Sequence, residues 1–147
     1  TASGFASPIG LVIAGDGRAR ASVQRAAAGN PHVRLIAPIT DRAAFANVLA
    51  SADALVHGSE SETFCMIAAE ARASGIPMFL PDSGAAADHY AAADGVSLVD
   101  RLDRFVTDGP ASHLATARAA AAGTRTMDAH FADLFALYAL HGQALAA

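Results

Sequence analysis

The stretch ADALVHGSESETFCMIAAEARASGIP, residues 52–77, contains an apolar run, a polar loop and an alanine-rich segment. The apolar run at 53–57 is expected to form a strand, because it is short and bounded by polar and turn residues. The alanine-rich segment at 63–74 is expected to form a helix that Gly75 and Pro77 terminate. A strand followed by a helix is the repeating unit of a parallel sheet. This stretch therefore predicts an α/β fold.

The same alternation runs along most of the chain. Strands are expected at 10–15, 33–37, 53–57, 77–81 and, more weakly, 95–99. Helices are expected at 18–28, 41–51, 63–74, 85–93, 101–106, 111–122 and 126–145. The last helix has an apolar stripe, expected to be a packing face, formed by Phe131, Leu134, Phe135 and Tyr138. The pattern predicts one domain over 1–147, a Rossmann-like open parallel sheet with helices on both faces and a helical carboxy-terminal end.

Charge and composition exclude several classes of protein. The net charge is −4, and the ten basic residues, all arginine, form no stripe, so nucleic acid is not an expected partner. No apolar run is long enough to span a bilayer, and the first ten residues do not resemble a signal peptide. With the single cysteine Cys65 there is no internal disulfide. These features favour a cytoplasmic protein.

The sequence GDGRAR at 15–20 follows a strand and opens a helix, the position of a dinucleotide-binding fingerprint. Arg20 stands where the third glycine is needed, and the next strand ends at Ala37 rather than at a ribose-binding carboxylate. A nicotinamide-dependent dehydrogenase is therefore disfavoured. Gly15 and Gly17 fit either a tight turn or a loop that faces a ligand.

Glu70 is an unusual residue for the middle of an alanine-rich helix. No positive side chain lies three or four residues away, so an intrahelical ion pair is not available. Its carboxylate must face solvent, pair with a remote arginine, or accept hydrogen bonds from a ligand.

Glu62 completes an S-x-x-E capping box with Ser59, which is a sufficient structural explanation for it. In a continuous helix Glu62 and Glu70 would lie about 12 Å apart. The backbone N–H groups near Thr63, Phe64 and Cys65 would then offer an anion site between two carboxylates. Such a surface would recognise a phosphate flanked by hydroxyl groups.

Residues 52–77 resemble the signature of retaining GT-B glycosyltransferases of family 4, in which two glutamates are separated by seven residues. The strand and turn LVIAGDG and the segment RLIAPITD are similar to other parts of that family. The residues that match the signature are Asp53, Ser59, Glu62, Phe64, Glu70, Ala71, Ala73, Gly75 and Pro77.

This resemblance implies the carboxy-terminal, donor-binding half of a two-domain enzyme that transfers a hexosyl group from a nucleoside-diphosphate sugar. It implies that Glu62 is the catalytic-site carboxylate that holds the donor sugar, and that Glu70 holds the ribose. Further donor-binding positions are expected at Ser59, Thr63, Phe64, Cys65, Gly15, Gly17, Pro38, Ile39, Ser83 and Gly84. An amino-terminal acceptor domain is expected as a partner outside this chain, and peripheral membrane association of the full enzyme is compatible with the resemblance.

The chain also departs from the family pattern. Cys65 replaces a glycine, the chain contains no lysine for the diphosphate, and the strand and helix that carry the family's Gly-Arg and Lys are not present. Two alternatives therefore stay open: a nucleotide-sugar epimerase on the same double-Rossmann plan, and a module that binds a nucleotide or protein without chemistry.

No metal site and no cofactor are expected. The six histidines show no i, i+4 pair and no cysteine partner at ligand spacing. His57 ends a predicted strand, where it either contacts a phosphate or is simply a polar terminal residue.

Overall fold

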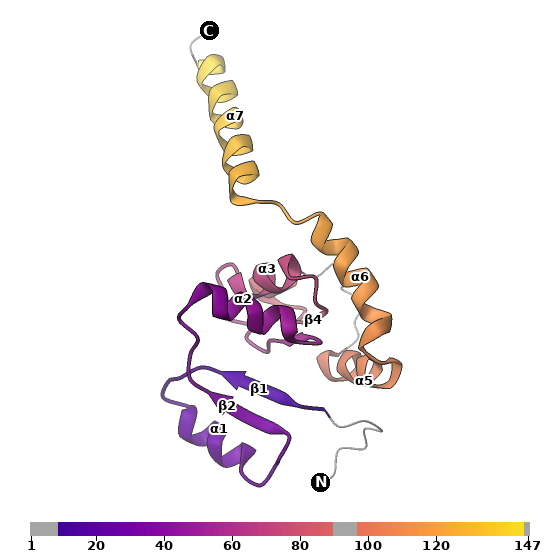
Figure 1. The fold of residues 1–147 in the computed structure, drawn as a ribbon. Coiled ribbons are helices and arrows are strands. Elements are labelled where there is room, and N and C mark those ends of the chain that lie inside the picture. The colour runs from indigo at the N-terminus through magenta and orange to yellow at the C-terminus, as the bar shows by residue number, and fades with distance from the viewer. Residues whose placement is uncertain (1–8, 90–96, 146–147) are drawn as a thin grey trace.

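The computed structural model describes residues 9–89 and 97–145, with side chains described as far as residue 139. Four short strands alternate with helices over the first part of the chain, and helices alone follow (Figure 1). The α/β class expected from the sequence is confirmed.

The first part is a strand–helix–strand unit made of β1 (Leu11–Ala14), α1 (Arg20–Ala27) and β2 (Val33–Ile36). The two strands are parallel, with Leu11 opposite Val33. The Arg20 guanidinium donates to the carbonyl of Gly15 at 2.5 Å and reaches the carbonyl of Ile36 at 3.5 Å. Arg20 thus ties the ends of both strands together, which explains an arginine where a dinucleotide fingerprint has glycine.

The second part comprises α2 (Arg42–Ser51), β3 (Leu55–Val56), α3 (Met66–Ala73) and β4 (Met78–Phe79). β3 and β4 are parallel, with Leu55 opposite Met78. The alanine residues of α3 allow a close approach to the strands, so Ala68 and Ala71 are fully buried, as is Leu80 just after β4. This region holds the hydrophobic core.

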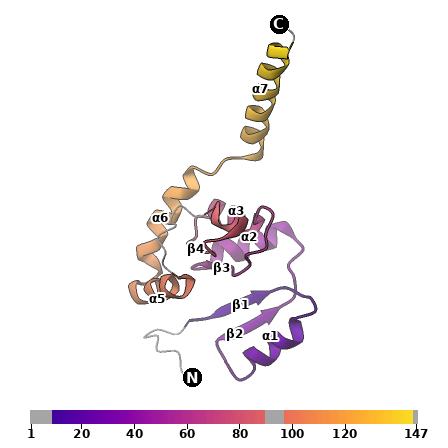
Figure 2. The same cartoon turned by 180° about the vertical axis from the view of Figure 1, so that it is seen from behind.

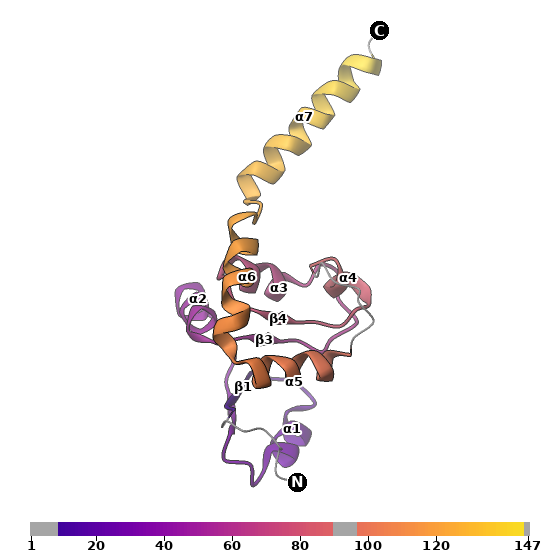
Figure 3. The same cartoon turned by 90° about the vertical axis from the view of Figure 1, so that its right-hand side faces the viewer.

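Four helices complete the described chain: α4 (Gly84–Ala87), α5 (Leu98–Asp108), α6 (Pro110–Ala122) and α7 (Met127–Leu145). α5 packs on the second strand pair through Phe105, whose ring centroid lies 5.2 Å from that of Phe79. Figure 3 shows β3 and β4 between α3 and α5, so this strand pair has a helix on each face as predicted.

The strands do not form the single five-stranded sheet that the sequence predicts. In the described ranges, β1 pairs with β2 and β3 pairs with β4, which gives two separate two-stranded sheets. Figure 2 shows the two pairs as distinct layers. Each strand is also shorter than the apolar run from which it was predicted.

The prediction of a weak fifth strand at 95–99 is wrong for residues 97–99, which the structure describes. Leu98 and Val99 begin α5, because the Ser97 hydroxyl caps the helix by accepting from the Asp100 backbone N–H at 3.1 Å. Residues 95 and 96 lie outside the described part of the chain. The helix expected at 85–93 is observed over 84–87, and residues 90–93 also lie outside the described part.

The final helix is confirmed, but its apolar stripe is not buried. α7 leads away from the rest of the molecule (Figure 1), and Phe131, Phe135 and Tyr138 are 43%, 62% and 63% exposed. The prediction of a packing face is therefore wrong for this chain by itself, because the neighbouring elements do not extend along the helix. No helix in the described ranges is long and apolar enough to cross a membrane.

Candidate functional site

The loops that follow β3 and β4 lie together at the carboxyl ends of these parallel strands, the edge where open α/β sheets bind ligands. Gly84 joins the two loops. A Cβ on Gly84 would lie 2.4 Å from the carbonyl oxygen of Glu60, and φ at this glycine is +64°. Only glycine fits this close approach without displacing the backbone of the neighbouring loop.

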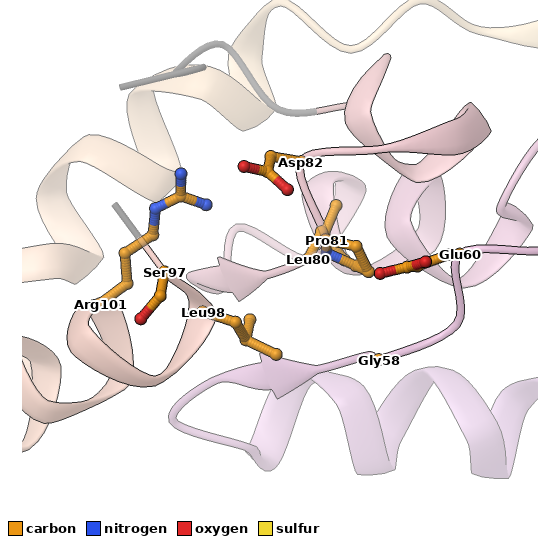
Figure 4. A pocket seen from close by; sticks show the side chains of 8 residues that line it. All are labelled: Gly58, Glu60, Leu80, Pro81, Asp82, Ser97, Leu98 and Arg101. Atoms are coloured by element: carbon orange, nitrogen blue, oxygen red, sulfur yellow. The ribbon is translucent and has the colours of Figure 1, made fainter. Parts of the chain in front are cut away.

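A pocket of about 390 Å³ opens between these loops and the start of α5 (Figure 4). Its charged lining residues are Glu60, Asp82 and Arg101, and Figure 4 shows the side chains of Asp82 and Arg101 pointing toward each other. Arg101 is only 6% exposed. Two carboxylates and one guanidinium leave the pocket with a negative balance, which suits a neutral, hydroxyl-rich group better than a phosphate.

The sequence did not single out these three residues. Arg101 was expected only as the first residue of a helix at 101–106, and its place beside Asp82 depends on the packing of α5 against β4. The adjacent positions Ser83 and Gly84 were expected at the site. They lie directly after Asp82, where Ser83 precedes α4 and Gly84 contacts the loop after β3.

Glu62 is not part of a capping box. The helix begins later than predicted, at Met66, and its N-cap is Cys65 rather than Ser59. The Glu62 carboxylate instead lies 3.2 Å from Nε2 of His57, and both side chains are partly buried. His57 is therefore paired with an acidic group and is more than a polar strand-terminal residue.

Because residues 62–65 are not helical, two further expectations are corrected. The 12 Å separation between Glu62 and Glu70 assumed a continuous helix and does not apply. The free N–H groups of the first helical turn belong to Met66 and Ile67 rather than to Thr63 and its neighbours, since the N–H of the third residue donates to Cys65.

Phe64 lies in the loop before α3 and is 56% exposed. The imidazole of His89 packs edge-on against the Phe64 ring, with centroids 5.0 Å apart, and its Nε2 lies 2.5 Å from the Phe64 carbonyl oxygen. His89 thereby connects the segment just after α4 to the loop that carries Thr63 and Phe64.

Glu70 pairs with a remote arginine, one of the three environments that the sequence left open. Oε1 of Glu70 lies 3.3 Å from Nη2 of Arg42, and the two side chains are 25% and 86% exposed. Arg42 is the first residue of α2, directly after the loop that contains Pro38 and Ile39. Glu70 is therefore close to the start of α2, which follows the carboxyl end of the first strand pair.

The turn after β1 carries Gly15 and Gly17. Gly17 has φ of +142° and a backbone N–H that donates to the Asp16 carboxylate at 2.7 Å. Both glycines belong to a tight turn, and an added Cβ would meet nothing within 4 Å at either position, so the turn is open to the surroundings. Both interpretations of these glycines remain compatible with the structure.

Three side chains at the end of β3 bring different ligand chemistries together. One potential ligand atom from each of His57, Glu62 and Cys65 lies within 4.8 Å of the others, and Cys65 is 2% exposed. Sequence spacing did not indicate this group. The three residues lie at the end of β3 and in the loop that precedes α3.

A mixed α/β fold with parallel strands, followed by helices, is consistent with one half of a GT-B glycosyltransferase. The chain belongs to the family described as glycosyl transferases group 1, whose model matches residues 5–124. This match covers both strand pairs, the candidate site and α6.

Three curated relatives share about two-fifths of the aligned residues. A GDP-mannose-dependent alpha-mannosyltransferase of Mycolicibacterium smegmatis is 39% identical over 105 residues, which cover 69% of this chain and 26% of that protein. A Mycobacterium tuberculosis protein of the same name is 40% identical over 78 residues, which cover 53% of this chain and 20% of that protein.

The third is a GDP-mannose-dependent alpha-(1-6)-phosphatidylinositol dimannoside mannosyltransferase of Mycobacterium tuberculosis. It is 40% identical over 90 residues, which cover 54% of this chain and 23% of that protein. The matched region thus spans about a quarter or less of each relative's length. No solved structure matches the chain.

Proposed function

We propose that this chain is the donor-binding domain of a retaining glycosyltransferase and that its donor is a nucleoside-diphosphate hexose, with GDP-mannose the first candidate. The family match and the names of the three relatives support this proposal. The structural observation that carries it is the acidic cluster at the carboxyl ends of β3 and β4. A sugar nucleotide contains hydroxyl groups as well as a diphosphate. Its hydroxyl groups donate hydrogen bonds, and carboxylates are strong acceptors of them.

In this proposal Glu62 is the catalytic-site carboxylate that orients the donor sugar. The 390 Å³ pocket lined by Glu60 and Asp82 takes part of the hexosyl group, whose hydroxyls donate to these two carboxylates. Glu70 receives the ribose hydroxyls once Arg42 swings away, a small rearrangement because Arg42 is 86% exposed.

The remaining expected residues surround this path. Pro38 and Ile39 lie in the loop between β2 and α2, shortly before Arg42, and in this proposal they contact the base. The first turn of α3 offers its N–H groups to the diphosphate. The turn after β1, the loop before α3 and the loop after β4 contribute the other contacts, from Gly15, Gly17, Ser59, Thr63, Phe64, Cys65, Ser83 and Gly84.

Transfer requires a partner domain that binds the acceptor, since groups on both sides of a cleft stabilise the transition state. The protein is proposed to need no cofactor for the sugar transfer itself. The mannosyltransferase names of the relatives favour a transferase over an epimerase or a module without chemistry.

Calorimetric titration of the full-length protein with GDP and GDP-mannose tests the donor site. Glu70→Ala is expected to weaken binding of both ligands by about 1–3 kcal/mol, because it removes an ionised acceptor from the ribose. Asp128→Ala, which removes an exposed carboxylate on α7, is the matched control and should leave binding unchanged. Equal affinity of the Glu70 variant and the parent protein would refute the assignment.

The reaction is tested by following the anomeric configuration of the product with NMR. A glycoside with the same anomeric configuration as the donor supports a retaining transferase. Release of a free epimerised sugar would instead show that the protein is an epimerase. If GDP-mannose binds but is not turned over, a binding module without catalytic activity is favoured.

A further inference from the structure

The imidazole of His57 and the carboxylate of Glu62 form a hydrogen bond, with Nε2 3.2 Å from Oε1. A carboxylate only accepts hydrogen bonds, so the imidazole is the donor and Nε2 carries the hydrogen. Nε2 carries a hydrogen both in one neutral tautomer and in the imidazolium form, so the contact does not require a charged histidine. The two side chains are 22% and 29% exposed, which limits competition from water for this bond and leaves Glu62 accessible to a ligand.

His57 is held by the more rigid part of this region. It directly follows β3, and its backbone N–H donates to the carbonyl of Phe79 at 3.0 Å. This bond extends the β3–β4 ladder beyond Val56, which lies opposite Phe79. The position of the imidazole is therefore fixed by the sheet.

Glu62, in contrast, lies in the loop between β3 and α3. A glutamate side chain has many rotamers, so ordering it when a ligand binds costs conformational entropy. The far end of the loop is anchored at Cys65, which is 2% exposed and belongs to the hydrophobic cluster around Leu80. The loop is thus held at both ends, and the hydrogen bond to His57 holds the Glu62 side chain between them.

The contact with His57 is compatible with sugar binding by the same carboxylate. A carboxylate has two oxygens with about four acceptor positions in total. The hydrogen bond from His57 uses one position on Oε1, so Oε2 can accept from sugar hydroxyl groups at the same time. A carboxylate that is already oriented binds more tightly, because less freedom is lost when the ligand arrives.

We propose that His57 is a positioning residue for the donor sugar, which fixes the Glu62 carboxylate in the orientation that the sugar hydroxyls require. This inference rests on the proposed role of Glu62 in the donor site. His57 acts through Glu62 in this arrangement and not by contact with a phosphate, so its effect is confined to ligands that carry the hexosyl group.

Calorimetric titration of full-length variants with GDP-mannose and GDP tests the proposal. His57→Leu removes the hydrogen-bond donor and should weaken GDP-mannose binding by about tenfold, the scale of one hydrogen bond to a charged group. GDP binding should stay unchanged, which also shows that the variant is folded. His57→Gln places an amide N–H near the position of Nε2 and should restore most of the affinity. His32→Leu, the same change at an exposed histidine, is the matched control and should bind both ligands as the parent protein does.

A double-mutant cycle measures whether His57 acts through Glu62. Glu62→Ala removes the carboxylate and should itself weaken GDP-mannose binding. In that background His57→Leu should cause no further loss, because the imidazole then has no carboxylate to orient. An additive loss in the double variant would show that His57 acts independently of Glu62 and would overturn the proposal.

The same titrations separate this proposal from the donor-site assignment. Equal weakening of GDP and GDP-mannose by His57→Leu would place His57 at the diphosphate and overturn the positioning role. A loss of GDP-mannose affinity with Glu62→Ala but none with His57→Leu would also refute the positioning role, and only that role. Unchanged GDP-mannose affinity in Glu62→Ala would instead refute the donor-sugar role of Glu62, on which the proposal rests.

Discussion

Arg42 and Glu70 form an ion pair that joins the start of α2 to the middle of α3, with Nη2 and Oε1 3.3 Å apart. The pair explains why a carboxylate is tolerated on an alanine-rich helix. The Glu70 side chain is partly exposed and is paired with an arginine of the preceding helix. Since Arg42 is 86% exposed, this pair is screened by water and remains exchangeable for a ligand.

The exposure of this ion pair predicts a small contribution to stability. Arg42→Ala should lower the free energy of unfolding by less than about 1 kcal/mol, the usual range for exposed pairs. Urea denaturation followed by circular dichroism measures the change, and a double-mutant cycle with Glu70→Gln isolates the pair. A coupling energy above about 2 kcal/mol would mean that the pair is structural, and would weaken the case for a ligand at Glu70.

Gly84 should be intolerant of any side chain. Gly84→Ala places a Cβ 2.4 Å from the carbonyl oxygen of Glu60 and imposes a left-handed backbone on alanine, so a loss of about 2–4 kcal/mol is expected. Gly58→Ala is the control, because its Cβ would meet nothing within 4 Å and its φ is not in the left-handed region. Thermal unfolding of both variants measures the effect. Equal midpoint temperatures for the two variants would contradict the observed contact between the loops.

Cys65 is expected to store backbone strain. Cys65→Gly and Cys65→Ala both remove the thiol, but only glycine relieves the left-handed conformation, so the glycine variant should be more stable by about 1 kcal/mol. Both variants lose the buried sulfur, so its contribution cancels in the difference between their free energies of unfolding. Chemical denaturation measures the difference, and greater stability of the alanine variant would show that residue 65 is not left-handed in solution.

The pocket beside the strand ends predicts a selective effect on the sugar. If the hexosyl group occupies it, Asp82→Asn should weaken GDP-mannose binding by about 1 kcal/mol and leave GDP binding unchanged. Titration with both ligands makes GDP the internal reference. Equal weakening of both ligands would place the nucleotide in the pocket instead, and no change in either would remove Asp82 from the donor site.

The amino-acid sequence by itself determined the class of fold and the family, and it predicted where the candidate site lies. Apolar runs alternating with helical segments predicted α/β structure, and helices were found at nearly all the expected places. The pattern around Glu62 and Glu70 led to the family that the comparison then showed. These features are local, because strand and helix periodicity and turn residues act over a few positions.

Tertiary structure decided how the side chains meet. Three features differ from the sequence-based prediction. The strands form two pairs, α3 begins at Met66, and Ser97 caps α5 where a strand was expected. The pairing of Glu70 with Arg42 spans 28 positions of the chain. Sequence spacing carries no information about such contacts, because they form only when separate helices and loops pack against the same strand ends.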